Sequence, residues 1–131
     1  SALVPGGTGL RPFHPLVIAL AAGANFVARS FSGDPANTAQ MIVEAIRHPG
    51  FSLLEILSPC VTFRPEERDW AKQVHPAAVD ETSDRARAAR RVLTDDGFNT
   101  GILFRGDRAP YQPSVNLEVV SSVDFETEFQ P

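Results

Sequence analysis

The clearest pattern in the chain is an apolar run, an amphipathic segment and a second apolar run, all within residues 26–63. The first run is broken at Gly33 and Asp34. Asp34 followed by Pro35 is typical of a helix start, because the carboxylate can accept from the free amides of the first turn and proline lacks only an amide that would be unpaired there. The sequence His-Pro-Gly at residues 48–50 ends the predicted helix.

This helix is predicted to have one apolar face, since four apolar residues recur at helical spacing: Ala39, Ile42, Val43 and Ile46. The run FSLLEIL that follows is nearly continuously apolar, with Glu55 as its one charge. Such runs are typical of strands that are covered on both faces, as in parallel sheets. The pattern therefore predicts a βαβ unit with a right-handed crossover.

Further elements are predicted on both sides of this unit. The segment PLVIALAA is apolar all round and is followed by Gly23, which favours a buried helix. Ser83 is predicted to cap an arginine-rich helix with the apolar stripe Ala86, Ala89, Val92 and Leu93. GILFR is predicted to form a short strand. We therefore expect an α/β fold, a mainly parallel sheet with helices on its faces, with helices at 15–22, 35–48 and 84–95 and strands at 25–30, 51–57 and 101–104.

One α/β domain is expected over residues 15–113, between a linker or loop at 1–14 and an acidic tail at 114–131. The GGTG run of the linker has neither a preceding strand nor a following Gly-Lys-Ser/Thr, which favours a flexible loop over a phosphate-binding loop. The charged segment after Cys60 is interpreted as an irregular arm or a short helix on the surface, anchored by Trp70. The tail is open to three interpretations: an edge strand, a disordered segment or a segment that wraps a partner chain.

The charge distribution argues against nucleic acid and membrane as partners. The 131 residues have a formal net charge of −4, and the four acidic residues beyond Arg108 account for all of it. The rest of the chain therefore lacks the basic field that nucleic acid or an anionic membrane requires. Arginines on the predicted helix could bind phosphate or RNA, but the surrounding acids favour a solvated face. A cytoplasmic location is expected, because there is no membrane-length apolar run, no signal-peptide pattern and only one cysteine.

Few residues carry candidate chemistry. Cys60 directly follows the second predicted strand, and ligands of open α/β sheets bind at the carboxyl ends of strands. The alternative is that Cys60 is a small buried apolar residue. Glu55 is either a general base or, as the apolar strand around it favours, a member of a structural ion pair or a strand-end residue. The three histidines each adjoin a proline, have no partner at metal-ligand spacing and are interpreted as turn residues.

Several segments, in sequential order, resemble one protein family. They are GANFVAR at residues 23–29, HPGF at residues 48–51 and SPCVTF at residues 58–63. The sequence from residue 15 to residue 63 closely resembles the β subunit of 2-oxoacid:ferredoxin oxidoreductases, which include the 2-oxoglutarate and pyruvate enzymes. The resemblance is looser up to about Tyr111 and is not seen beyond Ser114. It implies that the fold is half of a thiamine-diphosphate-binding fold.

The resemblance also implies the chemistry of a complete enzyme. Enzymes of the family oxidatively decarboxylate a 2-oxoacid with thiamine diphosphate, Mg²⁺ and a [4Fe–4S] cluster, and they pass electrons to ferredoxin and the acyl group to coenzyme A. The chain lacks the family's early cluster cysteines and its Gly-Asp-Gly-Asp stretch. It therefore resembles the C-terminal half of the subunit, whose partner is the α subunit, and no cofactor is expected in the isolated chain. By the same resemblance Cys60 is the last ligand of the cluster near thiamine diphosphate, and Arg64 stands where the family often has Asn.

Two function classes remain open from the sequence. One is the C-terminal part of the β subunit, inactive alone, and the other is a self-standing α/β protein-interaction module without cofactor chemistry. Both have the same fold, so the fold does not separate them. An open reading frame that continues upstream through Gly-Asp-Gly-Asp would favour the first, and a start codon near Ser1 would favour the second. Half of a doubly wound domain leaves a sheet edge uncovered, so a dimer or higher oligomer is expected.

Overall fold

A computed structural model describes residues 9–10, 13–77 and 81–110 of the chain. The predicted linker at 1–14 lies outside the described residues except for residues 9–10 and 13–14. The predicted acidic tail at 114–131 lies outside them entirely, so its three interpretations stay open.

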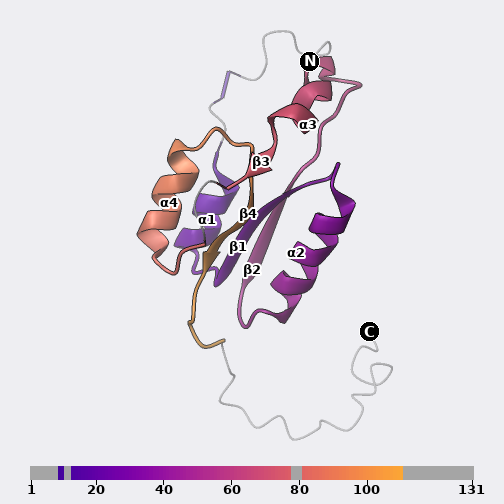
Figure 1. Ribbon diagram of the computed structural model, residues 1–131. Coiled ribbons are helices and arrows are strands. Elements are labelled where there is room, and N and C mark those ends of the chain that lie inside the picture. Colours follow the sequence, from indigo (N-terminus) through magenta and orange to yellow (C-terminus); the bar gives the residue numbers. More distant parts are fainter. Residues whose placement is uncertain (1–8, 11–12, 78–80, 111–131) are drawn as a thin grey trace, which may run out of the picture.

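Every predicted helix and strand is present, with ends that differ from the prediction by one or two residues (Figure 1). In chain order the elements are α1 (Pro15–Ala21), β1 (Phe26–Phe31), α2 (Pro35–Arg47), β2 (Ser52–Leu57), the 3₁₀ helix η1 (Pro65–Asp69), α3 (Trp70–Gln73), β3 (His75–Pro76), α4 (Arg85–Thr94) and β4 (Asn99–Arg105). The predicted arm corresponds to η1 and α3, and its Trp70 packs edge-on against Phe98 with 5.6 Å between ring centroids. None of the helices in the described ranges has the length and apolar composition needed to cross a membrane.

The strands form one sheet in the order β2-β1-β4-β3. β1 pairs with β2 in parallel and β3 pairs with β4 in parallel, which confirms the mainly parallel sheet. The central pair, β1 with β4, is antiparallel. The pattern of apolar runs did not indicate this reversal. The chain direction reverses between β2 and β3, through the arm of η1 and α3, whereas α4 returns the chain to β4 parallel to β3.

The pairing of β1 with β4 contains a β-bulge. Val27 lies opposite Phe104 and Ala28 lies opposite Ile102, so Leu103 is an extra residue on β4. As a consequence, Leu103 and Phe104 both belong to the same core cluster although they are neighbours on one strand.

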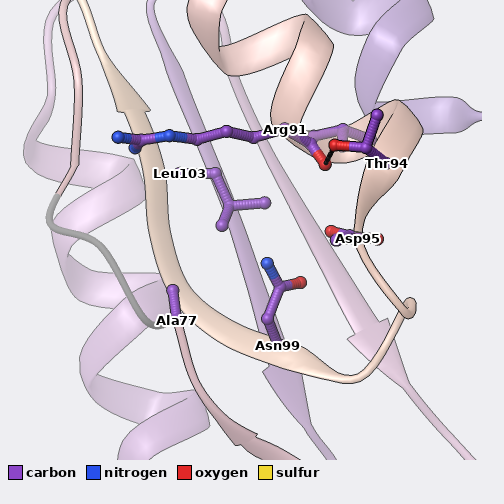
Figure 2. Close-up of a pocket in the computed structure, with 7 residues that line it drawn as sticks. Ala77, Arg91, Thr94, Asp95, Asn99 and Leu103 are labelled. Atoms are coloured by element: carbon purple, nitrogen blue, oxygen red, sulfur yellow. Dashed lines mark hydrogen bonds between the residues drawn. The ribbon is translucent and has the colours of Figure 1, made fainter.

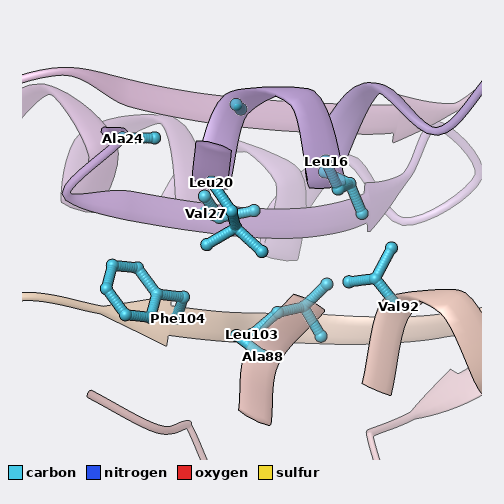
Figure 3. Close-up of a cluster of buried hydrophobic side chains, with 9 residues drawn as sticks. Leu16, Leu20, Ala24, Val27, Ala88, Val92, Leu103 and Phe104 are labelled. Atoms are coloured by element: carbon cyan, nitrogen blue, oxygen red, sulfur yellow. The ribbon is translucent and has the colours of Figure 1, made fainter. Parts of the chain in front are cut away.

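The larger core lies between the sheet and the layer formed by α1 and α4 (Figure 3). Its buried residues are Leu16, Ala19, Leu20, Ala24, Val27, Ala88, Val92, Leu103 and Phe104. α1 lies between the sheet and α4 and buries Leu16, Ala19 and Leu20, but Ile18 is 56% exposed, so the prediction of a buried helix is correct for one side of α1 only. Gly23 then ends the helix with a φ of 91°, a backbone angle that glycine adopts readily.

The opposite face of the sheet is covered by α2, which begins as predicted. The Asp34 carboxylate accepts from the backbone N–H of Asn37 at 3.1 Å, and Pro35 is the first helical residue. The buried residues of this smaller core are Phe26, Ala28 and Met41.

The predicted apolar face of α2 is present, but it does not face the sheet. Ile42, Val43 and Ile46 are 41%, 42% and 77% exposed, and Ala39 is exposed as well. Met41 and Ala45 pack against the sheet instead. The helix carries two apolar stripes about 100° apart, and the sheet covers one of them.

The start of α4 also differs from the prediction. Asp84, and not Ser83, is the N-cap, since its carboxylate accepts from the Arg87 N–H at 3.0 Å. Thr82 supports this turn, because its hydroxyl accepts from the Asp84 N–H at 3.1 Å.

The buried stripe of α4 is turned from the predicted one. Ala88 and Val92 are buried, whereas Ala86 and Leu93 are exposed. The cause is Arg85, which points inward. Its guanidinium donates to the carbonyls of Leu20 and Ala24 at 2.6 and 2.9 Å. It also lies 4.7 Å from the centroid of the Phe104 ring, a cation–π contact that joins α4 to the core.

Candidate functional site

The candidate site is the turn that carries Cys60. β1 and β2 are parallel, so both end at the same edge of the sheet, and Cys60 lies in the turn that directly follows β2. The side chain is exposed and forms no disulfide, since the sequence has no other cysteine. The alternative of a small buried apolar residue is therefore wrong, and a reachable thiol remains.

The backbone of this turn is held on both sides of Cys60. Its carbonyl accepts from the N–H groups of Phe63 and Arg64 at 3.2 and 2.8 Å. Its own N–H donates to Oε2 of Glu67 at 2.7 Å. The other carboxylate oxygen of Glu67 lies 3.0 Å from Nε of Arg64. The backbone of Cys60 thus takes part in three hydrogen bonds, two at its carbonyl and one at its N–H.

Arg64 remains cationic in this arrangement. A side-chain hydrogen bond with Glu66 and the charge of Glu67 raise the pKa of its guanidinium above the ordinary value. The position at which the resemblance expects Asn therefore carries a positive charge, and two carboxylates of η1 compensate it.

A second polar cluster lies at the same edge of the sheet, around Arg29 of β1. Arg29 is 6% exposed, and its Nε lies 2.6 Å from Oε2 of Glu55, its partner in the register of β1 and β2. Its Nη1 lies 3.1 Å from Oδ2 of Asp95 and also donates to Oδ1 of Asn99. Glu55 is therefore in a structural ion pair, as the sequence favoured over a general base.

A cavity of about 200 Å³ adjoins this cluster (Figure 2). Its lining residues are Ala77, Arg91, Val92, Thr94, Asp95, Asn99 and Leu103. Two polar side chains of the wall, those of Asp95 and Asn99, are bound to Arg29. The cavity therefore borders a structural network and lacks a nucleophile with an adjacent base.

The histidines do not join Cys60. His14 precedes α1, His48 follows α2 and stacks on Phe26, and His75 begins β3, which agrees with turn and boundary roles. Hydrogen bonds from the imidazole to the Asp96 carboxylate and to the carbonyl of Pro76 raise the pKa of His75. In residues 9–10, 13–77 and 81–110 no three His, Cys, Asp or Glu side chains are placed to hold a metal ion.

The residues present fit one part of the implied cofactor set. A [4Fe–4S] cluster takes four thiolates, and Cys60 offers one from an exposed, fixed turn. The described residues do not fit thiamine diphosphate with Mg²⁺, because they offer no carboxylate cluster for the metal and the sequence lacks Gly-Asp-Gly-Asp.

Sequence reasoning passed over three buried polar residues, Asn25, Arg29 and Glu67. Arg29 was detectable, since Arg29 and Glu55 are each the one charge in an apolar strand, with opposite signs at matching positions. Asn25, 2% exposed, was missed too; its amide donates to the carbonyls of Pro49 and Arg108 at 2.9 and 2.8 Å. Glu67 had no signal, because it stands in a run of charges on a surface arm.

No protein-family model matches the chain. The β subunit of a 2-oxoacid:ferredoxin oxidoreductase from Sulfolobus sp is 33% identical over 129 residues, which cover 86% of this chain and 42% of that protein. The corresponding subunit from Saccharolobus solfataricus is 28% identical over 116 residues, which cover 85% of this chain and 38% of that protein. The chain is a relative of 2-oxoacid:ferredoxin oxidoreductase β subunits.

A solved relative agrees with this oxidoreductase relationship. The 2-oxoglutarate:ferredoxin oxidoreductase of Magnetococcus marinus, with 2-oxoglutarate, coenzyme A and succinyl-CoA bound, matches with a TM-score of 0.70 and 29% identity. The match covers 82% of this chain and 38% of that chain. The chain thus spans about two fifths of the length of these oxidoreductase subunits. The α/β fold and the family resemblance are both confirmed.

Proposed function

We propose that the chain is the C-terminal part of the thiamine-diphosphate-binding β subunit of a 2-oxoacid:ferredoxin oxidoreductase. The observation that carries this proposal is the SPCVTF turn, which presents an exposed Cys60 thiol directly after β2. The relatives from Sulfolobus sp and Magnetococcus marinus support the family. The complete enzyme would oxidatively decarboxylate a 2-oxoacid, 2-oxoglutarate or pyruvate, to an acyl-CoA and reduce ferredoxin.

In this function Cys60 is one thiolate ligand of the iron–sulfur cluster, which carries electrons toward ferredoxin when it is bound. The chain's own contribution is to bring the thiolate to the edge of the sheet and to hold its backbone still. Thiamine diphosphate and Mg²⁺ would be held by parts of the subunit other than the described residues. The α subunit is the expected partner. The isolated chain supplies one thiolate of four, so we expect it to be colourless and inactive.

The test is Cys60→Ser in the oxidoreductase assembled with this chain. Serine is a harder ligand than cysteine, so iron per subunit should fall. Thiamine diphosphate content should stay the same, while electron delivery to ferredoxin drops sharply. Thr62→Ala is the matched control, because Thr62 is an exposed residue of the same turn. Full cluster occupancy in the serine variant would overturn the ligand assignment.

The alternative function, a self-standing interaction module, is favoured by one observation. The outer stripe of α2 exposes Ile42 and Ile46. β2, which has no partner on its outer side among the described strands, exposes Ile56. We propose that in the isolated chain a second copy covers this surface, giving a dimer or higher oligomer. If the assembled protein binds no iron but associates through this surface, the interaction module is the better description.

A further inference from the structure

Glu67 is a buried carboxylate on an otherwise exposed arm. The residue is 5% exposed, while its neighbours Glu66 and Arg68 are both exposed. Burying a carboxylate costs free energy unless the charge is paired and its oxygens accept hydrogen bonds. The arm therefore holds Glu67 inward through specific contacts.

Each oxygen of this carboxylate has one partner in the Cys60 turn. Oε2 accepts from the backbone N–H of Cys60 at 2.7 Å. Oε1 lies 3.0 Å from Nε of Arg64, and the backbone N–H of Arg64 in turn donates to the carbonyl of Cys60 at 2.8 Å. The three residues form a closed ring of contacts, so neither polar backbone atom of Cys60 is free to reorient alone.

We propose that Glu67, with Arg64, is a positioning residue that fixes the Cys60 turn for cluster ligation. This inference rests on the proposed ligand role of Cys60. A ligand whose backbone is held in one conformation loses little entropy on binding iron, and partners of this kind commonly change metal affinity by about 10- to 100-fold when removed.

The ring of contacts has a second consequence. The Cys60 N–H donates to Glu67, so it would not be available to a sulfur of a cluster bound at Cys60. Hydrogen bonds to cluster sulfurs and nearby positive charge both stabilise the reduced state. Glu67 would therefore lower the reduction potential of such a cluster, by occupying this amide and by offsetting the positive charge of Arg64.

The first test uses the 131-residue chain itself and follows hydrogen exchange of the Cys60 amide by NMR. Glu67→Ala should accelerate exchange by about tenfold or more, as expected for the loss of a hydrogen bond to a charged group. Glu67→Gln keeps an oxygen acceptor and should restore most of the protection. Glu66→Ala is the matched control: Glu66 also pairs with Arg64, at 3.0 Å, but does not contact Cys60. Unchanged exchange in Glu67→Ala would overturn the inference.

The second test uses the assembled oxidoreductase and measures iron per subunit and the potential of the cluster. Glu67→Ala should lower iron occupancy, and Glu67→Gln should retain iron but raise the potential. A residue that only stabilised the fold would lower the melting temperature without changing the potential. Should Glu67→Ala fail to fold, Glu67→Gln and Arg64→Asn still test the proposal through the potential.

The two proposals fail separately. Loss of iron in Cys60→Ser, together with wild-type iron and potential in both Glu67 variants, would overturn the positioning role alone. Full iron in Cys60→Ser would overturn the ligand role, whatever the exchange of the Cys60 amide shows.

Discussion

The two faces of the sheet differ in how completely they are covered. Among the described residues, the face under α1 and α4 has nine buried residues in one apolar cluster, and the face under α2 has three. The side chains of Ser30, His48 and Ser52 each have a buried polar atom without a hydrogen-bond partner. All three lie on the α2 side of the sheet. Ser30 lies on the same face of β1 as Phe26 and Ala28, at every second residue, and His48 and Ser52 flank the turn after α2.

The comparison teaches that α2 is only partly covered, although the sequence predicts an apolar face on this helix. Its outer stripe is apolar, and it adjoins β2, whose outer edge is unpaired in the described sheet. Buried polar atoms in native proteins are nearly always hydrogen-bonded. The exposed apolar residues and unpaired polar atoms on the α2 side are therefore typical of an interface. The side under α1 and α4 has the continuous buried cluster that is typical of a protein core.

The largest effect on stability is expected at Arg29, where the well-covered face ends. Arg29→Met would leave the carboxylates of Glu55 and Asp95 without their partner, at a cost of about 3–5 kcal/mol. Urea unfolding of the variant would show this as a lower midpoint. A double variant that also carries Glu55→Gln should recover part of the loss, and a single variant as stable as the original chain would contradict the role of this ion pair.

A matched pair of truncations tests the comparison directly. Leu20→Ala, at a residue 1% exposed in the larger core, should cost about 2–5 kcal/mol of unfolding free energy. Ile46→Ala, at a residue 77% exposed on α2, should change it by about 0.5 kcal/mol or less. Urea midpoints measured at a concentration where the chain is monomeric give both values. Equal losses would mean that the α2 stripe is as well packed as the core.

Association should depend on the α2 stripe. Ile46→Lys places a charge on the exposed apolar stripe and should shift the chain from dimer or higher oligomer to monomer, since a buried unpaired charge is unfavourable in an interface. Light scattering over a wide concentration range measures the mass. Leu93→Lys, on an exposed position of α4, is the control and should leave the mass unchanged. A monomeric original chain would contradict the association.

The sequence predicted the positions of the main helices and strands because capping residues and apolar runs are local signals. Asp34, Pro35 and Gly23 mark helix ends with backbone chemistry that no distant contact overrides. The directions in which α2 and α4 face were not predictable in this way. α2 has two apolar stripes, and its sequence does not show which of them packs on the sheet. The orientation of α4 depends on Arg85, whose partners are carbonyls some 60 residues away in the chain. For the candidate site, Cys60 was found from its turn, whereas Glu67 depends on side-chain contacts with Cys60 and Arg64 that its place in a run of charges does not indicate.

A smaller effect is expected from the link between α2 and the sheet. Arg105 of β4 lies 2.7 Å from Oε2 of Glu44, and this hydrogen bond lowers the pKa of Glu44. A carboxyl whose pKa is lowered on folding adds stability above its unfolded pKa, and the contribution is lost as the pH falls through the folded pKa. Glu44→Gln should therefore be less stable than the original chain near pH 7, with the difference closing under acid conditions. Urea midpoints from pH 7 to pH 3 measure it, and a constant difference would contradict the ionic origin.

The smallest effect is expected at His75 and Asp96, on the exposed rim where β3 meets β4. His75 Nε2 lies 2.9 Å from Oδ2 of Asp96, and this contact raises the pKa of His75 and lowers that of Asp96. The stabilisation from the charged histidine is fully present below the unfolded pKa of histidine, about 6.5, and is lost as the pH rises through the raised pKa of His75. The stabilisation from the aspartate is lost under acid conditions, as the pH falls through the lowered pKa of Asp96. Asp96→Asn should therefore return the pKa of His75 toward its ordinary value in an NMR titration. The same variant should reduce thermal stability only at pH values between the lowered pKa of Asp96 and the raised pKa of His75, where both groups are charged. Because both side chains are largely solvated, the change in stability should be slight while the pKa change stays measurable. A His75 titration that is identical in the variant would show that the pair does not form in solution.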